Sequence, residues 1–462
     1  MKSERRTIMQ HAGTVMVGQL AVMAFSITDT LVAGHFADTA LAALAVAAAT
    51  YVTVHISLMG MLQALLPVWA ELHGAQRHAE VGRSVRQALY LCAFTVILGM
   101  WALLCPDPLL TWTQVPGDMQ EDVRGYLRIM ALGLPASLLF RMYSTLNQSL
   151  GKPKLVTWVQ VGALAVKVPL SIVLVLGIPN MVPPLGLAGC AWATLLVMVM
   201  MLCLAIWLLK TQDFYQPYRI WDPLEKPDLS TLLRFARLGL PSGLAIGVEV
   251  TSFTLMSLFI ARLGVVATAS HQIVSNMAAV LYMVPLSLAI ASSSRVSYWI
   301  GAGEFVQARH ALRAGLELIL LLCICFATLI GWQRYTIASL YTQSPEVIEL
   351  AATMLLWLMI YHIADAVQVF AVFALRCYNI TVLPLITYAI LLWGLGLAGG
   401  YTVAYGVDID LSQWSWLAQQ SPIAFWQTAS LALYITTGVL LPILWRASHR
   451  KNKTHLVSRP TP

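Results

Sequence analysis

Charged residues are scarce in this sequence. Asp, Glu, Lys and Arg together make up 11% of the 462 residues, while hydrophobic residues make up 59%. A soluble domain carries about a quarter charged residues, because its surface faces water. The composition therefore excludes an ordinary soluble domain and indicates that lipid surrounds much of the chain. The formal net charge of +7 does not indicate nucleic-acid binding, because the basic residues are spread over short connections and the two ends.

Sequence signatures of catalysis and of cofactor binding are also missing. Neither HExxH nor GxSxG occurs, and the sequence has no glycine-rich phosphate loop. His271 and His362 are isolated, as histidines that pack within helices are. The seven cysteines have no metal-type spacing and lie mostly inside apolar runs, where cysteine acts as a small hydrophobic residue. We therefore expect no enzyme activity, no cofactor and no direct use of ATP.

Long apolar runs, by contrast, are abundant. A helix needs about 20 apolar residues to cross the hydrocarbon core of a membrane. Runs of this kind are separated by short segments rich in Gly, Pro and charge. They lie at 13–35, 43–70, 87–105, 126–148, 155–177, 186–210, 235–261, 268–294, 314–333, 348–375, 380–404 and 423–446. The sequence therefore predicts an all-α membrane protein with about twelve transmembrane helices.

The distribution of Lys and Arg predicts the orientation of these helices. The first segment, MKSERRTIMQHAG, leads into an apolar stretch that continues through Phe36, which is too long for a cleaved signal peptide. If the N-terminus is cytoplasmic, 22 of the 28 Lys and Arg residues lie in cytoplasmic segments and 4 lie in outer segments. Basic residues favour the cytoplasmic side. We therefore expect a multi-pass protein of a bacterial inner membrane with both termini in the cytoplasm.

The two halves of the chain repeat. GAQRHAEVGRSVRQAL, after the second run, aligns without gaps with GAGEFVQARHALRAGL, after the eighth, at an offset of 227 residues. Gly74 then falls on Gly301, and Arg86 falls on Arg313. Parallel repeats of this kind are typical of transporters, whose substrate site lies between the halves. We predict two pseudo-symmetric six-helix bundles. The predicted domains are an N-terminal bundle at 1–210, a cytoplasmic linker at 211–233, a C-terminal bundle at 234–446 and a basic cytoplasmic tail at 447–462.

Ionisable residues inside the apolar runs of the C-terminal half form one group. Such a side chain costs roughly 3 kcal/mol or more at the membrane centre, so it needs a partner or a function. Tyr361, Asp365 and Gln368 have the i, i+4, i+7 spacing that places them on one helix face. Glu249 lies eight residues after Pro241, which could loosen the seventh helix. Two neighbouring acids in a low dielectric share a proton or hold a cation. The alternative is an acid pair that only tethers helices.

The N-terminal half has a different set of polar residues. Asp29 lies in the first run, Lys167 and Ser171 share one face of the fifth, and Thr194 lies in the sixth. A lone ammonium would be costly here, and Asp29 is the strong counter-charge available in this half. Two hypotheses stay open. Asp29 and Lys167 form either a static ion pair in a polar cradle or a pair that switches with a proton.

Several segments resemble the multidrug and toxic compound extrusion (MATE) transporters, in particular their bacterial NorM-like branch. They are, in order, QLAVMAFSITDTLVAGHFADTALAALA, LPVWAELHGA, GKPKLV, PLGLAGCAWAT, LGLPSGLAIGVEV, ASHQIVSN and DAVQVFAVFALRCYN. Each piece is short, but the combination is specific and covers nearly the whole chain. The resemblance implies a MATE fold in which Glu249, Tyr361 and Asp365 take part in cation coupling. It also implies that Asp29 corresponds to the acidic residue of the family's first helix and is a further candidate for cation or proton coupling.

The sequence departs from this family at three places. The family commonly has proline at the position of Thr14. Two asparagines flank the central proline of the family's fifth helix, where this chain has Lys167 and Ser171. The signature of the tenth helix normally continues as Gly-x-Lys-Asp-Thr, whereas residues 377–381 read CYNIT. Since a tethered ammonium occupies space that a cation would need, we expect coupling to depend mainly on the C-terminal half.

The leading functional hypothesis is secondary antiport. A drug or another amphipathic organic cation leaves as H⁺ or Na⁺ enters, and Na⁺ would bind at Glu249 and Asp365. The alternative is a lipid-linked precursor flippase of the related superfold, whose cavity would carry several Arg or Lys residues for pyrophosphate. This sequence offers one such candidate, Lys167. We expect the lipid bilayer and small organic molecules as partners, no nucleic acid, and a monomer.

Overall fold

The computed structural model of the chain describes residues 2–107, 117–178, 181, 183–406 and 417–449. Helices make up nearly all of this part of the chain. Twelve helical segments within it are long and apolar enough to cross a membrane. Each of them overlaps one of the predicted apolar runs, so the predicted all-α membrane architecture is confirmed.

The helices follow one another with short connections. The first half contains α1 (Lys2–Phe36), α2 (Asp38–Gln63), α3 (Leu66–Gly74), α4 (His78–Leu104), α6 (Gly117–Ser149), α7 (Pro153–Leu176) and α8 (Leu187–Thr211). The short 3-10 helix η1 (Asp213–Tyr218) lies in the linker. The second half contains α9 (Leu229–Ala261), α10 (Val265–Gly301), α11 (Phe305–Ser339), α12 (Pro345–Arg376), α13 (Val382–Tyr388), the π-helix η2 (Ala389–Ala398), α14 (Gly399–Tyr405) and α15 (Ile423–His449).

The chain forms two compact units. Unit 1 combines Met1–Ala12 with Leu244–Pro462, and unit 2 is Gly13–Gly243. α1 and α9 therefore contribute to both units, although each is one continuous helix, and α9 runs through Pro241 without a break. The predicted domain boundaries stay a prediction. Residues 450–462 of the predicted basic tail lie outside the described residues.

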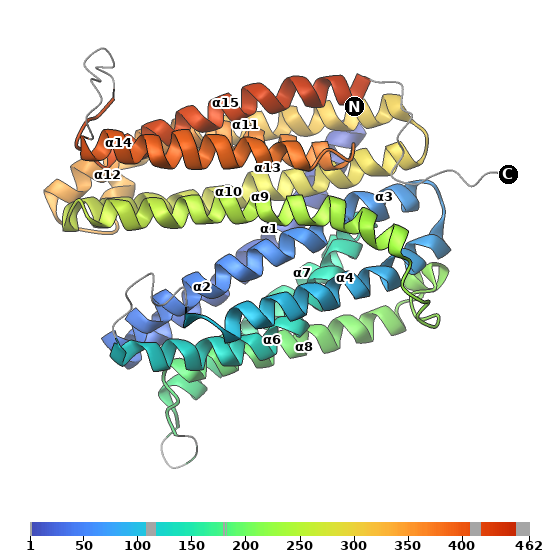
Figure 1. The fold of residues 1–462 in the computed structure, drawn as a ribbon, viewed down its shortest axis with the longest axis horizontal. Helices are drawn as coiled ribbons and strands as arrows, with labels where there is room; N and C mark the ends of the chain where they lie inside the picture. The colour runs from blue at the N-terminus through green and yellow to red at the C-terminus, as the bar shows by residue number, and fades with distance from the viewer. Residues whose placement is uncertain (1, 108–116, 179–180, 182, 407–416, 450–462) are drawn as a thin grey trace. The chain divides into compact units, whose positions relative to one another are not determined.

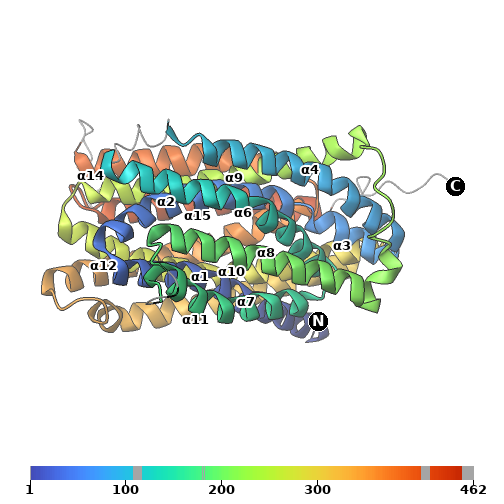
Figure 2. The same cartoon turned by 90° about the horizontal axis from the view of Figure 1, so that it is seen from below.

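Unit 2 is built around α6. This helix packs against α2, α4 and α8, which run alongside it in both views (Figures 1 and 2). Most of its apolar stretch is buried, 78% against 17–44% for the other spans. α6 is thus the inner helix of this bundle.

Unit 1 is built in the same way around α12. This helix packs against α10, α11 and α15. Leu355, Leu358, Ala366 and Phe370 of α12 are each 0–1% exposed and form part of the apolar core. η2 and α14 pack against α15. The polar residues of α12 are consequently held within a tightly packed interior.

The predicted repeat is visible in the backbone. α3 and α10 end at Gly74 and Gly301, and the next helix begins four residues later in each half. Within these turns Gln76 (φ 60°) and Gly303 (φ 79°) occupy equivalent positions, and both adopt the left-handed conformation. The backbone hydrogen bonds that close the two turns are also equivalent. Glycine adopts this conformation without strain, whereas glutamine rarely does. The two halves therefore keep the same turn geometry although one has Gln76 and the other Gly303.

The linker between the halves is bonded to unit 2. Arg86 of α4 donates two hydrogen bonds to the carboxylate of Glu225 and forms an ion pair with it. The side-chain amide of Gln87 donates to the backbone oxygen of Lys226 (3.0 Å) and accepts from the backbone N–H of Asp228 (2.9 Å). We call residues 213–228 the strap, because these contacts hold the segment along α4.

The first turns of α1 belong to unit 1 and are bonded to its other helices. Glu4 accepts two hydrogen bonds from Arg295 of α10, at 3.1 and 2.6 Å. Arg5 forms an ion pair with Glu317 of α11, and Ile8 is fully buried in the apolar core of this unit. Each of these contacts joins the start of the chain to helices of the C-terminal half.

Candidate functional site

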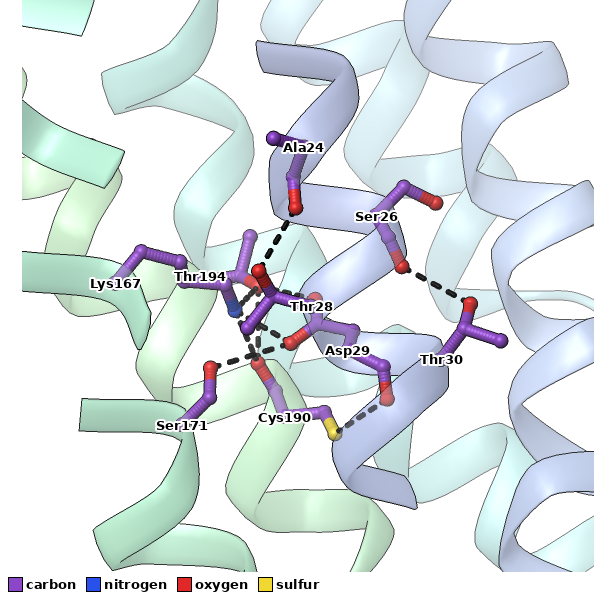
Figure 3. A network of polar contacts seen from close by, with 9 residues as sticks. All are labelled: Ala24, Ser26, Thr28, Asp29, Thr30, Lys167, Ser171, Cys190 and Thr194. Atoms are coloured by element: carbon purple, nitrogen blue, oxygen red, sulfur yellow. Dashed lines mark hydrogen bonds and ion pairs between the residues drawn. The ribbon is translucent and has the colours of Figure 1, made fainter. Parts of the chain in front are cut away.

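A polar network surrounds Asp29 in unit 2 (Figure 3). The ammonium of Lys167 donates to Asp29 Oδ1 at 2.7 Å and to Thr194 Oγ1 at 2.6 Å, and it lies 3.4 Å from the backbone oxygen of Cys190. The hydroxyl of Ser171 donates to Asp29 Oδ1 at 3.3 Å. All four residues named in the sequence for this half thus meet in one place.

Helical spacing explains why these side chains converge. Lys167 and Ser171 are four residues apart on α7, and Cys190 and Thr194 are four residues apart on α8, so each pair shares one helix face. In Figure 3 both pairs point toward Asp29 of α1. α1 therefore supplies the carboxylate, α7 supplies the ammonium and a hydroxyl group, and α8 supplies a second hydroxyl group.

The network is fully buried, which determines its energetics. Lys167 is 0% exposed and Asp29 is 6% exposed. An ammonium has three N–H donors, and the three acceptors around Lys167 match that number. A buried charge of this kind is tolerated because it is paired and hydrogen-bonded. Whether the pair is static or switches with a proton stays a prediction.

Asp365 and Gln368 form the centre of the second site, in unit 1. Both lie on α12, where Asp365 is 5% exposed and Gln368 is 0% exposed. The side-chain amide of Gln368 donates to Asp365 Oδ1 at 3.2 Å. Tyr361, one turn earlier, packs edge-on against Trp426 with 5.5 Å between ring centres. The predicted polar face of this helix is therefore present and lies in the interior of the unit.

Glu249 of α9 approaches this face. Its carboxyl group interacts electrostatically with Asp365, and the hydroxyl of Tyr282 donates a hydrogen bond to it. Tyr361 also lies within the electrostatic range of both acids. Two carboxyl groups in one apolar environment repel each other when both are ionised, so a proton or a metal cation stabilises the pair. Unit 1 consequently contains the acid pair that the sequence suggested.

Arg376 is buried near the acid pair. From the sequence alone we expect it to lie in a cytoplasmic segment between two helices. It is the last residue of α12 and is 3% exposed. Its guanidinium lies 4.4 Å from the ring centre of Phe373, and its charge acts on Glu249. A basic residue at the C-terminus of a helix is also stabilised by the helix dipole. Its place directly after an apolar run was the only signal in the sequence.

Two tyrosines near the acid pair were also missed. Tyr282 of α10 is the hydrogen-bond donor to Glu249. Tyr388, the last residue of α13, is 2% exposed and lies within the electrostatic range of both acids. An aromatic residue inside an apolar run gives no sequence signal, because tyrosine packs there equally well for structural reasons.

His271 and His362, the two isolated histidines of the sequence, both lie inside helices and are buried. The ring Nε2 of His271 lies 2.8 Å from Ser257 Oγ and 3.1 Å from Ser275 Oγ. His362 is 2% exposed within α12. Among the described residues, no group of three or more His, Cys, Asp or Glu side chains could hold a metal ion. Sodium at Glu249 and Asp365 would be held by oxygen donors, which replace the hydration shell of alkali cations, and it stays a prediction.

Comparison with known proteins gives consistent matches over nearly the whole chain. A model of the MatE family matches residues 15–173 and 241–402. The chain is 36% identical over 450 residues to a "Probable multidrug resistance protein NorM" of Aromatoleum aromaticum, which covers 96% of this chain and 94% of that protein. It is 32% identical over 451 residues to a protein of the same name from Chromobacterium violaceum, with 97% and 95% covered.

Solved structures show the same fold. The eukaryotic MATE transporter AtDTX14 superposes with a TM-score of 0.82 at 16% identity, over 97% of this chain and 99% of that one. A MATE protein in its bent conformation superposes with a TM-score of 0.84 at 15% identity, over 96% of both chains.

Proposed function

This chain belongs to the MatE family, and from this we propose that it is a secondary active multidrug efflux antiporter. It is a multi-pass membrane protein. In our proposal it exports amphipathic organic cations in exchange for H⁺ or Na⁺. It works as a monomer, without a cofactor, in a bacterial inner membrane with both termini in the cytoplasm. Its relatives are named as probable multidrug resistance proteins, and like the family to which it belongs it is not an enzyme.

The observation that supports coupling is the acid pair of unit 1. Glu249 and Asp365 lie close enough for their charges to interact, in an interior lined by Tyr282 and Gln368. The charge of Arg376 acts on Glu249, but one guanidinium cannot neutralise two ionised acids. The remaining negative charge is unfavourable in a low dielectric unless a proton or a cation joins the acids. Binding and release of an exchangeable cation would explain why the two acids are kept together despite this cost. An organic cation that competes with it for the same negative charge would leave as the inorganic cation enters.

The polar network of unit 2 supports a division of labour between the units. Lys167 supplies a positive charge to Asp29 at 2.7 Å, so the carboxylate already has a counter-ion in this structure. A second monovalent cation would meet the repulsion of this ammonium. We therefore assign the exchange of H⁺ or Na⁺ mainly to Glu249, Tyr361 and Asp365.

The alternative of a lipid-linked precursor flippase is not favoured. A pyrophosphate group would need several unneutralised basic side chains. The one candidate noted in the sequence, Lys167, is neutralised by Asp29.

Purified protein in liposomes tests the proposal. Efflux of ethidium, a fluorescent aromatic cation, should be driven by an imposed proton gradient or sodium gradient, and one of the two should suffice. Glu249→Gln and Asp365→Asn should each abolish this gradient-driven efflux at unchanged membrane abundance. Glu346→Gln, an exposed acid in the first turn of the same α12, is the matched control and should behave like the wild type. Gradient-driven efflux at the wild-type rate in either neutralised variant would contradict the proposal.

A further inference from the structure

η2 is an unusual element beside the acid pair. It is a π-helix of ten residues, Ala389–Ala398, between two short α-helices. π-helical turns are rare, and they occur frequently at functional sites. The sequence AILLWGLGLA contains two glycines but no residue that by itself explains the wider turn. The contacts of η2 with neighbouring helices depend on this wider turn.

One side of this segment is fixed to α15. Thr428 Oγ1 donates to the backbone oxygen of Gly396 at 2.8 Å. Just beyond η2, a Cβ atom at Gly400 would come within 2.6 Å of the Phe425 ring. Only glycine allows so close an approach. Since α15 itself packs on α12, η2 is anchored to the interior of unit 1.

The other contact of η2 is made by Trp393. Its indole N–H donates to the backbone oxygen of Val248 in α9 at 3.2 Å. The same oxygen also accepts hydrogen bonds from Ser252 Oγ (2.7 Å) and from Thr251 Oγ1 (3.1 Å). Thr251 Oγ1 in addition lies 2.6 Å from the oxygen of Gly247. Side-chain hydroxyls that bond back to helix carbonyls compete with the backbone and bend helices slightly.

The residue after Val248 is Glu249. The turn that carries this carboxylate is therefore locally weakened by its own hydroxyl groups, and it is held from outside by the indole of Trp393. We propose that Trp393 is a positioning residue for Glu249, and that the π-helix exists to present its N–H to this turn. This inference rests on the proposed coupling role of Glu249.

Trp393 holds Val248 mainly through its hydrogen bond and less through apolar packing of its ring. The side chain of Trp393 is 44% exposed, so replacing it with another aromatic residue removes little buried surface. Phenylalanine keeps an aromatic ring but has no donor. In histidine, Nε2–H takes the same place in the five-membered ring as the indole N–H. The two substitutions therefore separate the donor from the ring.

Efflux of ethidium from liposomes is measured against the concentration of the ion that drives the wild-type protein. Trp393→Phe should raise the half-saturating concentration of this ion roughly three- to tenfold, the effect of one lost hydrogen bond. The maximal rate should change by less than about twofold, because the acids remain. Trp393→His should restore the wild-type ion dependence in part or in full. Trp332→Phe, a tryptophan of α11 that is 78% exposed, is the matched control.

Glu249→Gln in the same assay separates this inference from the proposed function. If Glu249→Gln abolishes coupling and Trp393→Phe keeps the wild-type ion dependence, the positioning role is wrong. It is also wrong if Trp393→Phe and Trp393→His are equally impaired, because then the ring and not the donor matters. If Trp393→Phe fails to reach the membrane, Trp393→Leu serves as the donor-free variant and decides in the same way. If Glu249→Gln couples normally, the proposed function fails and this inference fails with it.

Discussion

At the scale of single residues, Lys167 is the clearest departure from the family pattern. Its ammonium is fully buried and bonded to Asp29, Thr194 and Cys190. Removing one partner of a buried ion pair leaves the other charge uncompensated, at a cost of roughly 3–5 kcal/mol. Replacing both partners by neutral residues avoids that cost. The pair therefore has a testable signature in double substitution.

Lys167→Met should lower membrane abundance and thermal stability more than the double variant Lys167→Met with Asp29→Asn. A static ion pair predicts that the double variant keeps coupled efflux, and a proton-switched pair predicts that it loses coupling or changes its pH dependence. Membrane abundance and the pH dependence of efflux, measured for both single variants and the double variant, separate the two. Lys154→Met, at an exposed position of the same α7, is the control. A silent Lys167→Met would show that the ion pair carries little energy.

At the scale of elements, the strap makes a pH-dependent contact. The hydrogen bonds from Arg86 lower the pKa of Glu225 from 4.5 to about 2. A carboxyl group whose pKa is lower in the folded state stabilises that state above its unfolded pKa. This contribution is complete above a pH of about 4.5 and is lost as the pH falls toward about 2.

Glu225→Ala should release the strap at neutral pH. We expect faster amide hydrogen exchange over residues 213–228 in the variant, while exchange in α6 stays unchanged. The wild type should lose the same protection, relative to the intrinsic exchange rate at each pH, when the pH is lowered through the window given above. Asp222→Asn, an exposed acid of the same strap, is the control. Equal protection of the strap in Glu225→Ala and in the wild type would contradict this account.

The start of α1 offers a comparison between two ion pairs on one element. The side chains of Glu4 and Arg295 are 11% and 22% exposed, whereas those of Arg5 and Glu317 are 45% and 48% exposed. Exposed pairs contribute about 0–1 kcal/mol, while hydrogen bonds to charged groups in less exposed places contribute about 1.5–3 kcal/mol.

Glu4→Gln should therefore lower the thermal unfolding temperature of the detergent-solubilised protein, and Glu317→Gln should leave it nearly unchanged. Arg295 also stacks on Tyr298 and Trp299, so its own replacement would remove more than the ion pair. The acidic partner is for that reason the cleaner one to change. If Glu317→Gln proves as harmful as Glu4→Gln, burial does not determine the strength of these pairs.

At the scale of the whole molecule, the internal repeat extends further than the aligned sequence segment. Gly151 (φ 69°) and Asn379 (φ 62°) both adopt the left-handed conformation in the turns that follow α6 and α12. Two backbone hydrogen bonds correspond as well: the bonds from Gly151 and Lys152 in the first turn match those from Asn379 and Ile380 in the second. Asparagine tolerates this conformation better than most residues do, which explains why the second half manages without glycine.

The orientation in the membrane is testable at the same scale. With the N-terminus in the cytoplasm, alkaline phosphatase fused after Ser344 should be active, and the same enzyme fused after Glu304 should be inactive. A fluorescent protein at the C-terminus should fluoresce, as it does in the cytoplasm. The strong excess of Lys and Arg in the inner segments is the physical reason. The opposite pattern of activities would reverse the predicted orientation.

The sequence alone determined the membrane character, the twelve spans and the repeat, because these depend on composition and spacing along one dimension. It also identified Asp29, Lys167, Glu249 and Asp365, since an ionisable residue within an apolar run is visible without any structure.

Which partners these residues have was decided only by the tertiary structure. Thr194 meets Lys167 because α8 presents one particular face to α7, and hydropathy does not encode how a helix is rotated about its axis. Arg376 is buried because other helices cover the end of α12, although its place in the sequence is typical of an exposed loop charge. The π-helix η2 likewise has no sequence signature, since its geometry follows from its packing on α15 and from the contact between Trp393 and Val248.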